Sequence, residues 1–181
     1  MSISADILFE RLSSLHRSLM RQVANEHGLQ LVHVEILQYL DICNRYSNTA
    51  QALTEYLGQT KGSISQSLKF LEENGLVERA PCEKDKRITR LTPSKRARTL
   101  IGQLATATKP AIPDTPENIH VLRNTLRHWQ ATHVSSKSFG QCQTCRFYTR
   151  DRGLGFRCGL TQEVLTTEDS VKICREHQHK D

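Results

Sequence analysis

Residues 52–79 read ALTEYLGQTKGSISQSLKFLEENGLVER, and this stretch decides the fold of the first part of the chain. Its apolar residues recur three or four positions apart in two short segments, a pattern typical of helices with one buried face. Gly58 ends the first segment. The second begins near Thr60 and ends at Gly75, which is expected to cap it. The stretch therefore predicts two short helices joined by a tight turn.

Two further helices are predicted before this pair. The first is long and amphipathic and ends near Gly28, and its apolar positions are Ile3, Ile7, Leu8, Leu12, Leu15, Leu19 and Val23. The second runs from about Val32 to Cys43. Asn48 is expected to cap the helix that follows, with Gln51 as its reciprocal partner in a capping box.

A β-hairpin rich in basic residues is predicted after the pair. Two strand-like runs, Leu76–Arg79 and Arg87–Leu91, surround a polar turn. Residues 84–98 hold one acidic residue, Asp85, and seven basic ones, Lys84, Lys86, Arg87, Arg90, Lys95, Arg96 and Arg98. This run alone accounts for the net charge of +6 of the 181-residue chain. Such a concentration of charge is expected on a surface that meets a polyanion, and a solvated basic face is the alternative.

Two more helices are predicted after the hairpin. Thr92 and Pro93 have the residue types of an N-cap and a first helical position, and Thr115 and Pro116 repeat the pair across the linker 109–118. The apolar stripe of the last helix consists of Ile119, Leu122, Leu126 and Trp129. The stripes of the first and last helices both need a partner that buries them.

The composition also excludes several classes of protein. The chain has no run of about 18 apolar residues, and acidic residues interrupt its amphipathic N-terminus, so neither a membrane span nor a signal peptide is predicted. We therefore expect a cytoplasmic protein without a membrane partner. No nucleophile with a paired base and no phosphate-binding glycine loop is found, so an enzyme is not predicted.

The order of the predicted elements resembles the winged helix-turn-helix regulators of the MarR family. The segments GLQLVHVEILQYL, ALTEYLGQTKGSISQSLKFLEENGLVER, DKR and LTPSKRARTL carry the resemblance, which covers about residues 5–130. It implies a mainly α-helical fold with a small β-hairpin in residues 1–133, used for DNA binding and dimerisation. It further implies that the helix from Thr60 to Asn74 is the recognition helix and that residues 83–90 form the wing.

Double-stranded DNA is the partner that this resemblance implies. Ser and Gln side chains can bond base edges in the major groove, and Lys or Arg neutralises phosphates. Arg87 at a wing tip suits a narrow minor groove, and Asp85 would hold its guanidinium by a charge-assisted bond. The predicted DNA-binding residues are Thr60, Lys61, Ser63, Ser65, Gln66, Lys69, Lys84, Asp85, Lys86 and Arg87.

A homodimer is implied as well. Regulators of this family pair their terminal helices, and the exposed stripes of the first and sixth helices here need such burial. A two-fold dimer would place its two recognition helices on a near-palindromic operator.

Residues 134–181 depart from the MarR resemblance. A polar linker, HVSSKSFGQ at residues 133–141, leads to the four cysteines Cys142, Cys145, Cys158 and Cys174. Beyond the linker stand six aliphatic residues (Leu154, Leu160, Val164, Leu165, Val171 and Ile173) and three aromatic ones (Phe147, Tyr148 and Phe156). This core is too small to fold without an added cross-link such as a bound metal or a disulfide. Paired cysteines in a reducing cytosol are more often metal or redox sites than disulfides. A metal-binding segment is therefore predicted.

The kind of metal site stays open between two alternatives. Four thiolates suit one tetrahedral Zn²⁺ or one iron–sulfur cluster. Structural zinc most often uses two C-x2-C turns, whereas this segment has one, and His177 is a possible further ligand. The segment also modestly resembles the cluster-binding part of high-potential iron–sulfur proteins, through Cys142, Cys145, Phe147, Cys158, Leu160 and Cys174. That resemblance implies a [4Fe-4S] cluster.

Two functions follow from these alternatives. The first is a transcriptional regulator whose cluster senses redox state, oxygen or iron. The alternative is a MarR-like regulator with a structural zinc that responds to a small molecule. Loss of a cluster is expected to unfold the segment and to shift the sixth helix, and with it the spacing of the recognition helices.

Overall fold

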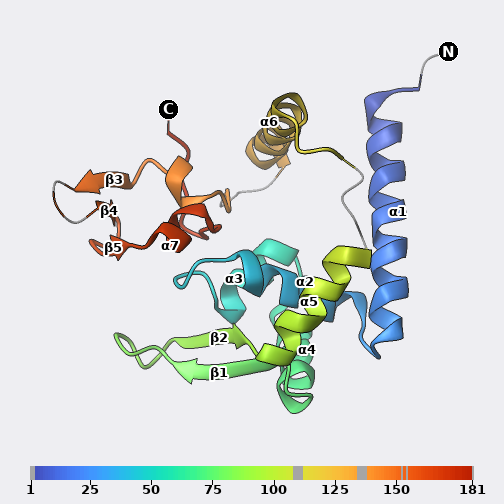
Figure 1. Cartoon of the computed structure of the whole chain (residues 1–181), viewed down its shortest axis with the longest axis horizontal. Helices are drawn as coiled ribbons and strands as arrows, with labels where there is room; N and C mark the ends of the chain where they lie inside the picture. Colours follow the sequence, from blue (N-terminus) through green and yellow to red (C-terminus); the bar gives the residue numbers. More distant parts are fainter. Residues whose placement is uncertain (1–2, 108–111, 134–137, 152, 154, 181) are drawn as a thin grey trace.

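The computed structural model describes residues 3–107, 112–133, 138–151, 153 and 155–180. Parts of the two predicted linkers, and Leu154, lie outside these residues. The first part of the chain consists of α1 (Ala5–Glu26), α2 (Leu31–Ile42), α3 (Ala50–Leu57), α4 (Lys61–Glu73), β1 (Val77–Pro81), β2 (Thr89–Pro93), α5 (Lys95–Ala107) and α6 (Pro116–His133) (Figure 1). The predicted order of helices and the predicted hairpin are confirmed.

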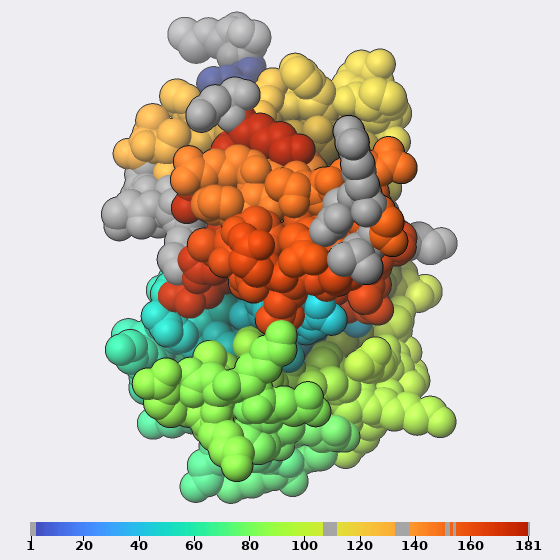
Figure 2. All heavy atoms as spheres, turned by 90° about the vertical axis from the view of Figure 1, so that its left-hand side faces the viewer, coloured from blue at the N-terminus to red at the C-terminus, as the bar shows by residue number. Residues whose placement is uncertain are grey.

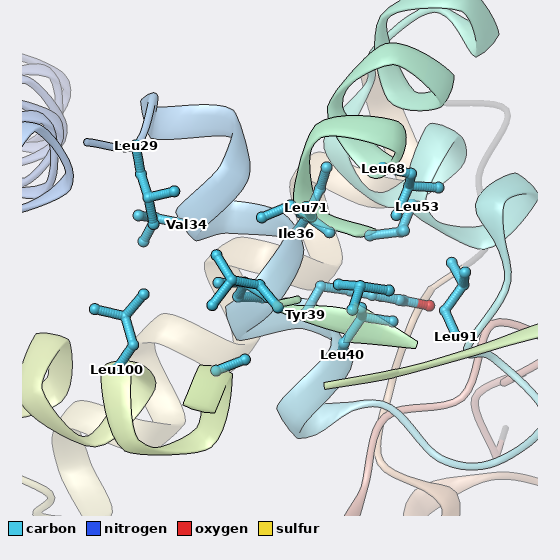
Figure 3. Close-up of a cluster of buried hydrophobic side chains, with 14 of the residues drawn as sticks. Leu29, Val34, Ile36, Tyr39, Leu40, Leu53, Leu68, Leu71, Leu91 and Leu100 are labelled. Atoms are coloured by element: carbon cyan, nitrogen blue, oxygen red, sulfur yellow. The ribbon is translucent and has the colours of Figure 1, made fainter. Parts of the chain in front are cut away.

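Helix α2 lies at the centre of the hydrophobic core. Its buried side chains are His33, Val34, Ile36, Leu37, Tyr39 and Leu40. All of these except His33 share one hydrophobic cluster with Leu53 of α3, Leu68 and Leu71 of α4, Leu91 of β2 and Leu100 of α5 (Figure 3). A helix that is apolar on most sides is stable only when other elements surround it. Helix α4 and the hairpin therefore both pack against α2.

The turn between α3 and α4 agrees with the prediction. Gly58 caps α3 in the left-handed region, at φ 62°, where a residue without a Cβ is favoured. The Thr60 hydroxyl caps α4 by accepting a hydrogen bond from the Ser63 N–H at 3.1 Å. At the C-terminal end of α4, Asn74 is the C-cap residue, and Gly75 follows it in the left-handed region at φ 65°.

Two predicted N-caps are wrong by one or two residues. Thr49 caps α3 with its side chain, whereas the Asn48 amide donates to the Leu91 carbonyl at 3.0 Å and ties the loop to the hairpin. Helix α5 begins after Ser94, whose hydroxyl accepts from the N–H three residues on, because Thr92 and Pro93 still belong to β2. In both places adjacent residues suit a cap equally well, and tertiary contacts select one of them.

Both strands of the hairpin lie one or two residues further along the chain than predicted. They pair antiparallel from Val77 opposite Pro93 to Pro81 opposite Thr89. Pro81 lies between the two predicted runs, but it ends β1, a position where a residue without an N–H is tolerated. Val77 and Leu91 are buried and fix the hairpin to the core, which leaves residues 82–88 as the projecting turn.

The cysteine-rich segment contains a small sheet that the sequence did not predict. A single 3-10 turn (Cys142–Thr144) precedes β3 (Tyr148–Asp151), β4 (Gly155–Cys158), β5 (Val164–Leu165) and α7 (Thr167–Val171). The strands are antiparallel in the order β3-β4-β5. Thr166 and Asp169 form a capping box at the start of α7.

This segment rests on the connection between α2 and α3 (Figure 2). The Asn44 N–H donates to the Ile173 carbonyl at 2.9 Å, and the Ile173 N–H donates to the Ile42 carbonyl at 3.0 Å. The Arg175 guanidinium makes two hydrogen bonds of 2.6 Å to the Glu55 carboxylate of α3. The two predicted parts of the chain are therefore in direct contact.

Helices α1 and α6 expose most of their apolar stripes. Leu8, Leu12, Leu15 and Leu19 of α1 are half exposed, as are Leu122, Leu126 and Trp129 of α6. The N-terminal half of α1 extends beyond the core (Figure 1). No helix among the described residues is long and apolar enough to cross a membrane.

Candidate nucleic-acid interface and cysteine site

Helix α4 presents a polar face opposite its buried one. Ile64, Leu68 and Leu71 point into the core because they recur three or four residues apart. The side chains of Lys61, Ser65, Gln66 and Lys69 are exposed, and Ser63 is half-buried beside the Thr60 cap. An exposed helix with hydroxyl, amide and ammonium groups on one side has the donors and acceptors that a major groove requires.

The turn of the hairpin holds an arginine in a fixed orientation. Nε and Nη2 of Arg87 each donate to the Asp85 carboxylate at 2.9 Å, and the Arg87 N–H adds a third bond at 3.0 Å. These bonds hold the pKa of Asp85 below its usual range. The Arg87 side chain is nevertheless 90% exposed. The predicted contact between Asp85 and Arg87 is confirmed, and it orients the guanidinium toward solvent.

The basic run 84–98 is divided between internal contacts and the wing tip. Arg90, Arg96 and Arg98 donate to the carbonyls of Tyr46, Asn74 and Pro93, respectively. Lys84 forms an ion pair with Glu163 of the cysteine-rich segment. Lys86 and Arg87 are therefore the basic residues of this run exposed at the wing tip, whereas Lys84 is paired with a carboxylate of the cysteine-rich segment.

The four predicted cysteine ligands line one cavity. Its wall also contains Phe147, Tyr148, Leu160 and Leu165 from the same segment and Asn44 and Tyr46 from the α2–α3 connection. Cys142 and Cys145 are 5% exposed. The cavity is thus shared between the two parts of the chain, an arrangement that the sequence did not predict.

The cavity disfavours free thiolates. Burial, together with the neighbouring Cys174, Cys158 and Cys145, raises the pKa of Cys142 to about 12. Burial also raises the pKa of Cys174, and the Asn44 and Ser47 side chains partly offset this effect. Four thiolates would become stable there if a cation lay among them, because a metal lowers the pKa of its ligands.

Two N–H donors beside the cysteines suit a sulfur-bound group. The buried Asn44 side chain acts on Cys174, and its Nδ2 has no other hydrogen-bond partner in the described part of the chain. The Gln178 N–H donates to Cys145 Sγ at 3.4 Å. Donors aimed at sulfur are a common feature of thiolate-bound metal sites.

His177 is not available as a ligand. Its ring is buried, with Nδ1 bonded to the Ser138 hydroxyl at 2.5 Å and Nε2 to the Thr144 hydroxyl at 2.9 Å. Burial lowers the pKa of His177 to about 4, so the ring is neutral and structural. Across the residues that the structure covers, no three His, Cys, Asp or Glu side chains are close enough to bind one metal ion.

The three aromatic residues have different positions. Phe147 and Tyr148 line the cavity. Phe156 stacks on Tyr148 with ring centroids 4.8 Å apart. Two of the three aromatic residues of the segment therefore face the cavity, and the third packs on one of them.

The elements and their packing define a winged helix-turn-helix protein. Residues 27–88 match the sequence model of the MarR family, whose members are DNA-binding regulators and not enzymes. The matched stretch runs from the end of α1 to the wing and contains every predicted DNA-binding residue. No curated protein matches the chain.

Solved structures of this kind share the fold at low sequence identity. A MarR-family transcriptional regulator from Silicibacter pomeroyi has a TM-score of 0.61 at 18% identity, covering 74% of this chain and 92% of that one. CouR from Rhodococcus jostii, solved with p-coumaroyl-CoA, has a TM-score of 0.58 at 18% identity, covering 72% and 94%. A MepR variant from S. aureus, solved with an oligodeoxyribonucleotide, has a TM-score of 0.50 at 16% identity, covering 72% and 99%.

Several site residues could not be found from the sequence. Asn44 and Tyr46 contribute to the cavity although they lie about a hundred residues before the first cysteine ligand. Glu163 contacts the wing, and Arg175 contacts α3. No local pattern marks any of them, because their role depends on how the segment docks.

Replacing Arg87 with Ala is expected to weaken binding to all duplexes and to flatten the salt dependence. The change removes one groove contact per protomer, so the slope of log K against log salt should fall by about 1 per protomer. Gln66→Ala should instead relax sequence preference, by about 1 to 3 kcal/mol at the base pair concerned. Titrations of labelled duplexes at several salt concentrations separate the two effects, and equal slopes for wild type and Arg87→Ala would contradict the assignment of the wing.

Proposed function

We propose that this protein is a DNA-binding transcriptional regulator. The observation that carries this proposal is the pairing of an exposed polar face on α4 with Arg87, which Asp85 holds at the tip of the adjacent wing. Direct base contacts would come from Ser63, Ser65 and Gln66. The match to the MarR family and the DNA complex of a protein with this fold support the same conclusion.

The working form in this proposal is a homodimer. The unburied stripes of α1 and α6 leave large apolar side chains at the surface, a feature of protein–protein interaction sites when such residues are contiguous. Phe9 of α1 and Trp129 of α6 lie edge to face, with ring centroids 5.0 Å apart, so the two helices are neighbours there. A second copy that covers both would give two recognition helices for a near-palindromic operator.

The cysteine site in this proposal holds a [4Fe-4S] cluster, bound by Cys142, Cys145, Cys158 and Cys174. The residues fit such a group, because the four thiols share an apolar cavity and Asn44 Nδ2 lacks another partner there. When bound, a cluster supplies reversible electron transfer and sensitivity to oxygen and iron supply. The chain itself supplies the ligands, excludes water with Phe147 and Tyr148, and donates hydrogen bonds to sulfur.

The spacing of the cysteines in the sequence supports a cluster rather than a single Zn²⁺, because structural zinc most often uses two C-x2-C turns and this segment has one. Four sulfurs that each lie about 2.3 Å from one zinc ion would stand about 3.8 Å from one another. Cys142 and Cys145 lie together in one C-x2-C turn, whereas Cys158 and Cys174 reach the cavity from separate parts of the segment. In a cluster each thiolate binds a different iron atom, so the sulfurs remain further apart. The proposed signal is therefore redox state, oxygen or iron.

Protein purified without air is expected to be brown and to contain iron and sulfide in near-equal amounts. Its broad visible absorbance should bleach when oxidant or chelator is added. Metal analysis and acid-labile sulfide determination on the same sample provide the measurement. Colourless protein with one zinc per chain would contradict the cluster. It would support the alternative, a regulator that contains a structural zinc and responds to a small molecule.

A further inference from the structure

Glu163 connects the cysteine-rich segment to the wing. Its carboxylate accepts a hydrogen bond from the Tyr46 hydroxyl at 2.8 Å and lies 2.5 Å from Lys84 Nζ. Arg45 Nη2 approaches the same carboxylate at 3.8 Å. Lys84 is the first group responsible for a pKa of Glu163 below its usual range, so the carboxylate is ionised at neutral pH. The carboxylate of Glu163 in the segment therefore binds the ammonium group of Lys84 in the wing.

The position of Glu163 depends on a predicted metal ligand. The Cys158 N–H donates to the Glu163 carbonyl at 2.9 Å, and the Gln162 N–H donates to the Cys158 carbonyl at 2.8 Å. These two bonds close a tight turn, in which Gln162 adopts a φ of 59°. A change in the position of Cys158 is thus transmitted through one turn to the carboxylate that binds Lys84.

A second interaction fixes the docked position of the segment. Arg175, which follows the ligand Cys174, makes its two bonds to Glu55 of α3. Its N–H also donates to the buried Ser47 hydroxyl at 2.8 Å. Helix α3 lies next to α4 in the helix-turn-helix. Two metal ligands therefore each adjoin a contact with the DNA-binding part, one at the wing and one at α3.

We propose that Glu163 withholds the wing lysine Lys84 from DNA while the segment is docked, so that the docked segment lowers DNA affinity; this inference rests on the proposed DNA-binding function. An ammonium group paired with a carboxylate contributes little net positive charge toward a phosphate, and the carboxylate itself repels the DNA backbone within a Debye length. Undocking would free Lys84 and withdraw the negative charge. This connection is more direct than the one expected through α6.

The test compares Glu163→Gln with wild type in anaerobic titrations of a labelled duplex that the wild-type protein has selected from a random pool. The substitution keeps the shape of the side chain and removes its charge. We expect affinity at low salt to rise roughly threefold to tenfold, because each dimer carries two such pairs. The slope of log K against log salt should steepen by about 0.9 for each additional phosphate that the freed lysines neutralise.

Two matched variants separate this effect from a general change in charge. Glu168→Gln removes the same charge from the same segment, at an exposed carboxylate that binds Lys172 and not the wing. It should leave affinity nearly unchanged. In a Lys84→Gln background, Glu163→Gln should raise affinity by less than it does in the wild-type protein, because only the repulsion between the carboxylate and DNA is then removed. A purely structural role of Glu163 predicts the same effect in both backgrounds.

The outcomes are distinct. Equal effects of Glu163→Gln and Glu168→Gln, or weaker binding by Glu163→Gln, would overturn the inference and leave DNA binding intact. Absence of any salt-dependent DNA binding by the wild-type protein would instead overturn the proposed function on which the inference rests.

Discussion

Replacing Cys174 with Ser is expected to empty the cysteine site and to raise operator affinity by about 1 to 3 kcal/mol, the usual range for coupling between two sites. The variant loses one of four ligands in a segment that has little core of its own, so the segment should unfold. Its contacts with Glu55, Ser47 and Lys84 would then be lost together. Anaerobic titration of operator at one fixed salt concentration measures the effect.

The winged part should remain folded in this variant. Its core around α2 does not include the cavity cysteines, so helical circular dichroism should fall only by the small contribution of the segment. Cys82→Ser is a suitable control for metal content, because Cys82 lies in the wing turn and not in the cavity. A Cys174→Ser protein that keeps its metal and its wild-type affinity would contradict this prediction.

Replacing Leu12 with Glu is expected to give a monomer that binds operator at least about a hundredfold more weakly. Leu12 is 50% exposed on the apolar stripe of α1, so a charge there costs little in the isolated chain and much in a buried interface. A dimer joins two recognition helices, and such linkage raises affinity by roughly 10² to 10⁴ over one site. Sedimentation equilibrium gives the mass, and titration gives the affinity.

The control for this variant is Glu10→Ala on the same helix. By helical periodicity Glu10 lies on the face opposite the stripe of Leu8, Leu12, Leu15 and Leu19. The control should remain dimeric with wild-type affinity. A dimeric Leu12→Glu protein would show that α1 does not supply the interface.

The winged part of the fold could be predicted from the sequence because its signals are local. Gly58 and Thr60 specify the turn between α3 and α4 through their own conformation and hydrogen bonding. The apolar spacing of α4 identified its buried face, and therefore its exposed one. Where two neighbouring residues offered the same local chemistry, as Asn48 and Thr49 do, the sequence alone did not select the correct one.

The arrangement of the cysteine-rich segment could be predicted only in part. Its four cysteines were expected at one site, and they line one cavity. The bonds between Ile173 and residues 42–44, and between Arg175 and Glu55, join positions more than a hundred residues apart. Such contacts form when the segment docks on the winged part, and no periodic pattern in the sequence indicates them. The expectation that the segment acts on DNA binding through α6 therefore did not include its contacts with α3 and the wing.

In the proposed mechanism, a metal site in the cysteine-rich segment regulates DNA binding by the winged part. The decisive experiment is an anaerobic titration of labelled operator with metal-loaded and chelator-stripped protein at one salt concentration, with iron and sulfide determined on the same samples. We expect iron and sulfide in near-equal amounts in the loaded form and tighter binding by the stripped form. Equal affinities of the two forms would contradict this mechanism and would mean that the cysteines only stabilise the segment.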